Sequence, residues 1–251
     1  MDESRVVEVS ATLPSGTSSF GSGYVVGAGL VLTARHLVCG GDGTVHQKVV
    51  IRAVTDGTPF RCQVAWAGRA DLDAALLRCD GLMPLAEPVR WGQLVASDAA
   101  DVEAAGFPRS MEQPGGLRDV ENLRGKVSPG TGVLGGSLYV DVTGARPRPG
   151  LWNGMCGAAV QCGSLLVGVV VWNVMAFDGG RLAAEPVTRL FDDAGFRALV
   201  GEDVAVEAAE LAAPRPRIPA QGPADLLRAE FRTARFRSRT ADLARLAAWC
   251  E

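Results

Sequence analysis

Residues 21–36 read Gly-Ser-Gly-Tyr-Val-Val-Gly-Ala-Gly-Leu-Val-Leu-Thr-Ala-Arg-His, and this stretch is the most informative part of the sequence about the fold. Its centre, residues 23–32, is rich in Val and Leu and is bounded by polar residues and Gly, which predicts a β-strand. The strand is followed by Thr-Ala-Arg and then by His36, one of only two histidines in the chain. The sequence therefore predicts a strand that carries a titratable imidazole just beyond its end.

Seven further short apolar runs occupy the chain up to residue 172. They are rich in Val, Leu or aromatic residues, and clusters of Gly, Pro, Asp or Ser separate them. The runs are residues 5–9, 49–54, 62–66, 74–78, 102–106, 138–142 and 165–172. Because no segment of helical periodicity lies between them, an all-β barrel or sandwich is favoured over alternating strands and helices.

The pattern changes near the C-terminus. Residues 188–200 predict a short helix with its apolar side chains inward, namely Leu190, Phe196, Leu199 and Val200. Proline-rich sequence then predicts an extended linker, and Pro223 opens a helical stretch because proline is tolerated in the first helical turn. We therefore expect a β domain at 1–200, a linker at 201–222 and a helical extension at 223–251.

Composition excludes several classes of protein. Hydrophobic residues make up 47% of the 251 residues, which is enough for a core and too many for a disordered chain. No apolar run reaches the roughly 18 residues of a membrane-spanning helix, and the N-terminus lacks a secretory signal pattern, so we expect a cytoplasmic protein without a membrane partner. Residues 213–251 carry eight Arg against four acidic residues, but a solvated helix face is favoured over nucleic-acid binding.

The six cysteines show no metal-binding or redox spacing. They are Cys39, Cys62, Cys79, Cys156, Cys162 and Cys250. None forms a Cys-x-x-Cys pair, and only His36 and His46 offer nitrogen ligands, so neither a metal nor a cofactor is expected. In a reducing cytosol the thiols should be free, and most should serve as small buried apolar side chains.

Two more segments combine with the one that ends at His36. One reads Asp-Leu-Asp-Ala-Ala-Leu-Leu at residues 71–77, and the other reads Asn-Gly-Met-Cys-Gly-Ala-Ala-Val at residues 153–160. In the order His, Asp and nucleophile, these segments resemble the trypsin/chymotrypsin-type proteases over about residues 5–200, and Ala-Gly-Phe-Pro at 105–108 adds to the likeness. The resemblance implies two six-stranded antiparallel β-barrels, peptidase activity and a protein or peptide substrate.

The resemblance assigns a role to each of these segments. A thiol or hydroxyl is a poor nucleophile until a base takes its proton, which is the expected role of His36. Asp73 would orient the imidazole. It is preferred to Asp71 because Ala at +2 and Leu at +3 and +4 from Asp73 match the register of the family. Asp71 is interpreted as a solvated loop carboxylate. Cys156 is the expected nucleophile, and the backbone N–H groups of Gly154 and Cys156 are the expected oxyanion hole.

Cys156 departs from the family, most of whose members have serine at this position. A thiolate is the stronger nucleophile, and some viral proteases use cysteine on this barrel. Three interpretations stay open: a natural cysteine nucleophile, an engineered replacement of serine that weakens turnover, and an inactive descendant that only binds peptide. Met155 is a second departure, since secreted members often have Asp there to pair with a new N-terminus, and activation by N-terminal cleavage is therefore not expected.

The resemblance also implies a pocket for the residue that precedes the scissile bond. Its expected lining is Gly150, Leu151, Trp152, Asn153, Val171, Trp172 and Asn173. Gly150 stands where a trypsin-like acidic residue would be, so a strict preference for Arg or Lys is not expected. For Trp172, a position in the core is an equally good interpretation.

The C-terminal segment carries a further resemblance. Residues 223–231 and 236–249 resemble the joint between an effector domain and an NTPase of the STAND or AAA type in bacterial conflict proteins. Ser238 and Thr240 replace the usual Gly and Glu, and the chain contains no P-loop, so only a partner or adjoining NTPase domain acting through residues 223–251 is implied.

We therefore expect a bacterial cytoplasmic endopeptidase with a His-Asp-Cys triad, serving as the effector module of a defence or signalling system. The alternative is a trypsin-like domain that binds a peptide or partner protein without efficient cleavage.

Overall fold

The computed structural model describes residues 2–54, 57–82, 87–95, 98–114, 116–132, 134–144, 147–148 and 150–209, all within one compact unit. The helical extension predicted at 223–251, the resemblance to an NTPase joint and residues 210–222 of the predicted linker lie outside the described residues.

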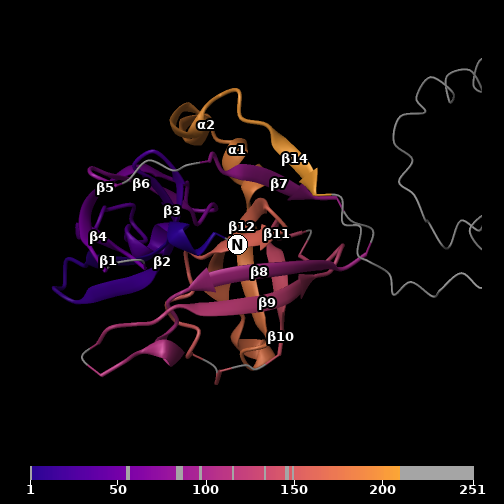
Figure 1. The fold of residues 1–251 in the computed structure, drawn as a ribbon, viewed down its shortest axis with the longest axis horizontal. Helices are drawn as coiled ribbons and strands as arrows, with labels where there is room; N and C mark the ends of the chain where they lie inside the picture. The colour runs from indigo at the N-terminus through magenta and orange to yellow at the C-terminus, as the bar shows by residue number, and fades with distance from the viewer. Residues whose placement is uncertain are drawn as a thin grey trace, which may run out of the picture. The chain divides into compact units, whose positions relative to one another are not determined.

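The first half of the described chain forms a closed six-stranded antiparallel barrel (Figure 1). Its strands are β1 (Val6–Thr12), β2 (Ser18–Gly27), β3 (Leu30–Thr33), β4 (Gln47–Ala53), β5 (Pro59–Ala67) and β6 (Ala75–Cys79). They pair in the order β1-β2-β3-β6-β5-β4, and β4 returns to β1. Branched apolar side chains fill the interior, and Val9, Val31 and Ile51 are each at most 1% exposed.

The second half forms another six-stranded antiparallel barrel. Its strands are β8 (Ala100–Gly106), β9 (Glu121–Val127), β10 (Leu138–Thr143), β11 (Ala159–Cys162), β12 (Leu165–Asn173) and β13 (Arg181–Pro186). The order is β11-β8-β9-β10-β13-β12, and pairing of β11 with β12 closes the barrel. Two further strands extend it in parallel, since β7 (Arg90–Leu94) pairs with β12 and β14 (Val206–Ala209) pairs with β7.

The two barrels confirm the predicted all-β class and its chymotrypsin-like architecture, with differences in detail. The strand expected at 23–32 is divided into β2 and β3 by a turn that contains Gly29, whose φ is +67°. Glycine adopts this left-handed conformation without steric cost, so a tight turn fits inside a run that reads as one strand. Residues 206–209 fall in the range predicted as linker, and they instead form β14.

The helix predicted at 188–200 is two helices, α1 (Val187–Phe191) and α2 (Ala194–Val200). Asp193 separates them because its side chain accepts hydrogen bonds from the N–H groups of Gly195 and Phe196 and so caps a new helix. Two of the four side chains predicted to point inward, Leu190 and Phe196, are fully buried, while Leu199 and Val200 are half-buried.

Aromatic packing joins the helices to both barrels. Phe196 of α2 lies edge-to-face against Trp66 of β5 at 5.2 Å and against Trp91 of β7 at 5.7 Å. Phe191 packs on Phe196 at 5.2 Å. These rings belong to one apolar cluster that also contains residues of β1, β3, β6 and β12, so the contact between the barrels is itself a hydrophobic core.

The expectation of free thiols is wrong for two cysteines. Cys62 of β5 and Cys79 of β6 are directly opposite one another, with their Cα atoms 4.3 Å apart, and they form a disulfide. The pairing depends on the register of two strands whose residues lie 17 apart, which the cysteine spacing alone did not reveal. Cys39, Cys156 and Cys162 are free.

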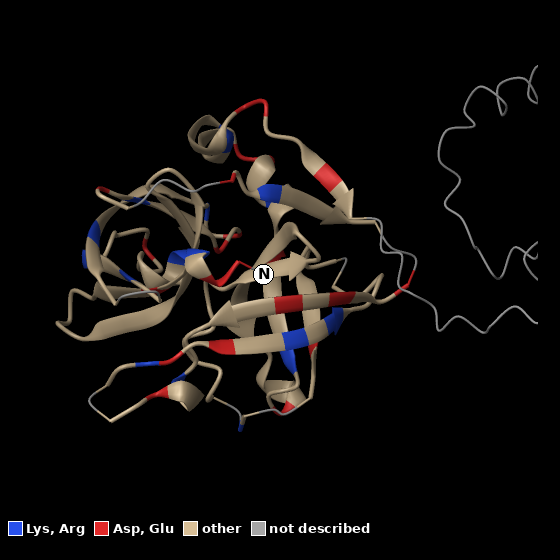
Figure 2. Cartoon of the chain, viewed as in Figure 1, with Lys and Arg blue, Asp and Glu red and all other residues tan. Residues whose placement is uncertain are grey.

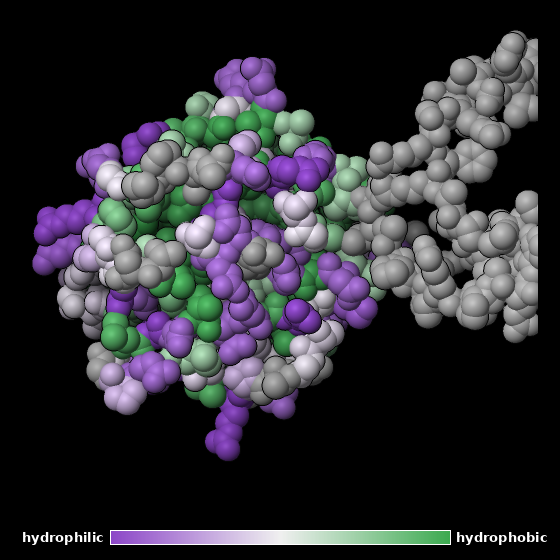
Figure 3. All heavy atoms as spheres, viewed as in Figure 1, coloured by the Kyte–Doolittle hydropathy of each residue, from purple (hydrophilic) through white to green (hydrophobic). Residues whose placement is uncertain are grey.

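Charged and apolar side chains are interspersed over the described surface. Basic and acidic residues are distributed over both barrels (Figure 2). Hydrophobic residues show between hydrophilic ones on the face drawn in Figure 3. Some opposite charges pair across neighbouring strands, as Lys126 of β9 does with Asp101 of β8 at 2.9 Å.

Candidate active site

His36 and Asp73 meet at the edge of the first barrel. β3 ends at Thr33, and the 3-10 turn Arg35–Leu37 that follows it carries His36. Asp73 lies in the loop that leads into β6, the strand paired with β3. Its carboxylate accepts a hydrogen bond from the backbone N–H of His36 at 2.9 Å and contacts the ring Nδ1 at 2.6 Å. Because an ionised carboxylate only accepts, Nδ1 carries a proton, and the two contacts together fix the orientation of the ring.

The surroundings of His36 favour its charged form. Burial lowers the pKa of the imidazole, but interactions with Asp73 and Cys156 outweigh it and raise the pKa from 6.5 to about 10. The ring nevertheless keeps 45% of its area exposed, so it is accessible to a substrate.

Cys156 reaches this site from the second barrel. It lies in the turn before β11 and its side chain is half-buried. The thiol donates a hydrogen bond to the backbone carbonyl of Val171 on β12 at 3.2 Å. The candidate base and nucleophile therefore come from different barrels, and their alignment depends on how the barrels are joined.

Two backbone N–H groups in the turn of Cys156 have no hydrogen-bond acceptor among the residues that the structure describes. The Asn153 carbonyl accepts a hydrogen bond from the N–H of Arg109 at 2.6 Å, and the Met155 carbonyl accepts one within the turn at 2.9 Å. Since the N–H and C=O of a trans peptide point in opposite directions, the N–H groups of Gly154 and Cys156 face away from these partners. Within the described part of the chain neither donates a hydrogen bond, so both are available to a developing oxyanion.

Glycine is required at two positions of this turn. Gly154 has φ +105° and Gly157 has φ +90°, a region that other residues rarely adopt. A Cβ at 154 would also collide with the carbonyl oxygen of Phe107, and one at 157 with the carbonyl oxygen of Ser22. The glycines thus allow both the conformation of the turn and its close approach to neighbouring backbone.

Ser22 of β2 holds the turn from the first barrel, a role that the sequence did not suggest. Its N–H donates to the Cys156 carbonyl at 2.8 Å, its Oγ donates to the Gly154 carbonyl at 2.6 Å, and the same Oγ accepts from the N–H of Phe107 at 2.9 Å. The residue is completely buried. A serine between two glycines in an apolar strand is the sequence feature that could have indicated such a close backbone approach.

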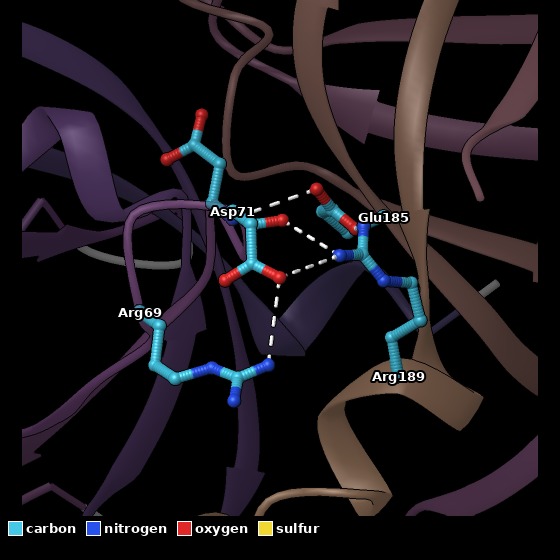
Figure 4. A network of polar contacts seen from close by, with 5 residues as sticks. Arg69, Asp71, Glu185 and Arg189 are labelled. Atoms are coloured by element: carbon cyan, nitrogen blue, oxygen red, sulfur yellow. Dashed lines mark hydrogen bonds and ion pairs between the residues drawn. The ribbon is translucent and has the colours of Figure 1, made fainter. Parts of the chain in front are cut away.

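The contacts of Asp71 run to arginines rather than to His36 (Figure 4). Its carboxylate lies between Arg69 and Arg189, each at 3.4 Å, and its backbone carbonyl accepts from Arg189 at 2.7 Å. Arg189 also pairs with the buried carboxylate of Glu185 at 2.8 Å. Of the two aspartates weighed from the sequence, the structure therefore brings Asp73 to His36 and engages Asp71 elsewhere.

The residues expected to line the substrate pocket lie in different environments. Val171 is buried next to Cys156, and Asn173 has a buried side-chain oxygen without a hydrogen-bond partner among the described residues. Trp172 is 58% exposed, which excludes a position in the core. Trp152 instead lies in the core of the second barrel, where its indole N–H donates to a backbone carbonyl at 2.8 Å. The other three are half-buried or exposed: Gly150, Leu151 and Asn153.

Within the described ranges, no three His, Cys, Asp or Glu side chains are grouped so that they could hold a metal ion. None of the helices in those ranges has the length and apolar character needed to cross a membrane.

Solved structures share this fold at low sequence identity. The active form of the Rv3671c protease from M. tuberculosis matches with a TM-score of 0.58 and 20% identity, covering 79% of this chain and 82% of that one. The thermostable serine protease AL20 from an extremophilic microorganism matches with 0.57 and 14%, covering 74% and 92%. Protease Anisep from Arthrobacter nicotinovorans matches with 0.54 and 15%, covering 73% and 90%. These similarities establish the fold.

Family membership comes from the sequence itself. A search of the curated proteins finds no significant match. A family model described as the trypsin-like peptidase domain matches residues 21–162, a range that contains His36, Asp73 and Cys156. Since the match covers more than half of the chain, the protein belongs to the family of trypsin-like peptidase domains.

Proposed function

We propose that the protein is an endopeptidase that cleaves its substrates through an acyl-enzyme on Cys156. The observation that carries the proposal is the placement of His36, which hydrogen bonds Asp73 at 2.6 and 2.9 Å and lies near enough to Cys156 for that residue to help raise its pKa. A base, the carboxylate that orients it and a nucleophile in one chain of contacts are the parts that acyl transfer requires.

The reaction would proceed in two stages. The Cys156 thiolate attacks the substrate carbonyl carbon, a C–S bond forms, and the electron pair of the carbonyl moves onto oxygen, which accepts hydrogen bonds from the N–H groups of Gly154 and Cys156. The C–N bond then breaks as His36 gives its Nε2 proton to the leaving amine. In the second stage, neutral His36 takes a proton from water, the hydroxide attacks the thioester, and the acid leaves from the thiolate.

The charge state of His36 suits a cysteine nucleophile. Serine requires a neutral imidazole to remove its proton, whereas the raised pKa of His36 makes it a cation at neutral pH. A thiol is more acidic than a hydroxyl, so a cysteine nucleophile depends less on a neutral base than serine does.

Alkylation of Cys156 by iodoacetamide across a range of pH tests the proposal. We expect rapid alkylation below pH 7, and in a His36→Ala variant we expect its onset to move up toward the ordinary thiol pKa of about 8.5. Mass spectrometry should find the label on Cys156 and distinguish it from Cys250, which lies outside the described residues; Cys39 and Cys162 are free but buried. Identical profiles in both proteins would refute the catalytic pair. Cleavage of a peptide library, with Cys156→Ala as the inactive control, then measures activity and substrate preference.

Peptide binding without cleavage is the second candidate function. One contact favours it, because the Cys156 thiol donates a hydrogen bond to the Val171 carbonyl at 3.2 Å, a backbone group that takes no part in acyl transfer. The exposed indole of Trp172 offers an apolar contact for a bound segment. Library peptides that bind and are recovered intact, together with Cys156 alkylation at the rate of an ordinary thiol, would establish this function instead.

We further propose that the peptidase is the effector of a bacterial defence or signalling system and that an NTPase acts on it through residues 223–251. The support is the resemblance of this segment to effector–NTPase joints. A cytoplasmic location is part of the same proposal, and the Cys62–Cys79 disulfide bears on it because disulfides are rare in reducing compartments. Thiol labelling in cells quenched with acid tests the location: a reduced pair supports it and an oxidised pair contradicts it.

A further inference from the structure

The loop that carries Asp73 is tied to the opposite barrel by a buried carboxylate. Glu185 lies in β13 of the second barrel and its side chain is only 7% exposed. One of its oxygens accepts a hydrogen bond from the backbone N–H of Asp73 at 3.5 Å, across 112 positions of sequence. None of the sequence motifs includes Glu185, and the steps of acyl transfer do not require it to react.

Arg189 completes the connection (Figure 4). This residue of α1 donates from Nη1 to the second oxygen of Glu185 at 2.8 Å and from Nη2 to the backbone carbonyl of Asp71 at 2.7 Å. A planar guanidinium can hold two acceptors at fixed angles, which a lysine cannot. The loop is therefore attached to the second barrel at two points of its backbone, one on each side of Leu72.

Arg189 is the cation that compensates the buried carboxylate of Glu185. Burial raises the pKa of Glu185, Arg189 lowers it, and the nearby negative charge of Asp73 raises it again. A Glu185 carboxylate without Arg189 would be an unpaired buried charge next to another carboxylate, and such charges are strongly unfavourable. Arg189 thus allows Glu185 to stay ionised where it can accept from the Asp73 backbone.

We propose that Glu185, held by Arg189, is a positioning residue that fixes the Asp73 loop of the first barrel relative to the second barrel, which carries Cys156. This role rests on the proposed function. The Asp73 carboxylate must meet both the N–H and the Nδ1 of His36, and a backbone anchored at residues 71 and 73 restricts its movement. In catalysis, a displacement of about 1 Å can lower the rate by up to about 100-fold.

Graded substitutions test the role. In Glu185→Ala and Arg189→Ala we expect kcat for peptide cleavage to fall about 10- to 100-fold with KM nearly unchanged. Glu185→Gln keeps an oxygen that can accept from Asp73 and should recover part of the loss. Arg69→Ala is the matched control, since Arg69 contacts the same Asp71 carboxylate at 3.4 Å but is 79% exposed, and it should leave kcat unchanged.

A spectroscopic measurement separates positioning from stability. The proton between His36 Nδ1 and Asp73 should give a far-downfield resonance in the NMR spectrum of the full chain, and we expect it to shift or broaden in Glu185→Ala and Arg189→Ala but not in Arg69→Ala. If the alanine variants fail to fold, Arg189→Lys and Glu185→Leu provide the same comparison, because lysine cannot hold two acceptors at fixed angles and leucine offers no acceptor. An unaltered resonance and kcat in these variants, with only a lower melting temperature, would overturn the role.

The outcomes also distinguish this role from the proposed function. Failure of the unaltered chain to cleave peptides or to show a reactive Cys156 would refute the peptidase function. The Nδ1 resonance reports on the position of Asp73 in either case, because it requires no turnover.

Discussion

Ser22→Ala should disturb the turn that carries Cys156, although Ser22 belongs to the first barrel and the turn belongs to the second. The hydroxyl of Ser22 makes two buried hydrogen bonds, to the Gly154 carbonyl at 2.6 Å and from the Phe107 N–H at 2.9 Å. Alanine leaves both backbone groups unpaired, and each such group costs about 1–3 kcal/mol, so the free energy of unfolding should fall by about 2–6 kcal/mol. This is a large part of the 5–15 kcal/mol that is typical of a domain.

The effect on activity should exceed the effect on the folded population. In the proposed mechanism Gly154 supplies one of the two N–H groups of the oxyanion hole, and loss of one such donor lowers turnover about 10²- to 10³-fold. Ser22→Ala releases the Gly154 carbonyl, which lies in the peptide next to the one that carries the Gly154 N–H, and it does not remove that N–H. We therefore expect a fall toward the lower end, about 10²-fold, in kcat corrected for folded protein. Urea unfolding followed by circular dichroism gives the stability, and peptide cleavage gives kcat.

Ser10→Ala is the matched control. Ser10 lies in β1, the neighbour of β2, and its hydroxyl donates to the Val50 carbonyl at 3.4 Å, away from the nucleophile turn. Its loss should cost less than about 1 kcal/mol of unfolding free energy and leave kcat unchanged. A Ser22→Ala protein that is destabilised but turns over at the unaltered rate would show that the Ser22 hydroxyl does not position the turn.

Three other predictions concern the fold and its dependence on conditions. Replacing both Cys62 and Cys79 by serine removes a cross-link between residues 17 apart and should lower the free energy of unfolding by about 3 kcal/mol. The urea midpoint of this variant should be lower than that of the oxidised protein. Equal midpoints would contradict a disulfide in the native protein. Phe196→Ala removes a fully buried ring that contacts Trp66, Trp91 and Phe191. It should lower the free energy of unfolding, again measured with urea, by about 3–5 kcal/mol. A decrease below about 1 kcal/mol would show that this cluster contributes little to stability. The pKa of His36 is raised on folding, so its stabilising contribution should be complete below pH 6.5 and disappear as the pH rises through about 10. The difference in unfolding free energy between the unaltered chain and His36→Ala measures this contribution, and a difference that grows with pH would contradict the sign.

The sequence was sufficient for the fold class and for the residues that form local patterns. His36 follows a strand at a recognisable spacing, and Asp73 precedes another, so pairing of the two strands brings the side chains together. The strands that were not predicted from the sequence have weaker local patterns. β9, for example, reads Glu-Asn-Leu-Arg-Gly-Lys-Val, and only its alternate residues Leu123 and Val127 show an apolar face. A half-buried strand with charges on its outer face has few features by which composition alone can identify it.

Residues whose roles depend on distant partners could not be found in this way. Ser22 lies 132 positions from Gly154, and Glu185 lies 112 positions from Asp73. Glu185 lies outside the segments that carry the resemblance, and Ser22 lies inside one of them without an assigned role, because a buried serine or glutamate in a strand becomes meaningful only when its partner is known. The Cys62–Cys79 pair is similar, because the register of β5 and β6, rather than cysteine spacing, brings the two sulfurs together.

Ser22 and Glu185 act across the same contact in opposite directions. Ser22 belongs to the first barrel and holds the Cys156 turn of the second, whereas Glu185 belongs to the second barrel and holds the Asp73 loop of the first. Each barrel therefore positions an element of the proposed catalytic site that the other one carries. The apolar cluster around Phe196 keeps the barrels in contact. It does not fix their relative orientation, because the hydrophobic free energy depends on the buried apolar area and is not directional. Directional hydrogen bonds between the barrels are what can hold His36 and Cys156 within reach of one another, and they explain why buried polar residues occur at a contact that apolar packing alone would stabilise.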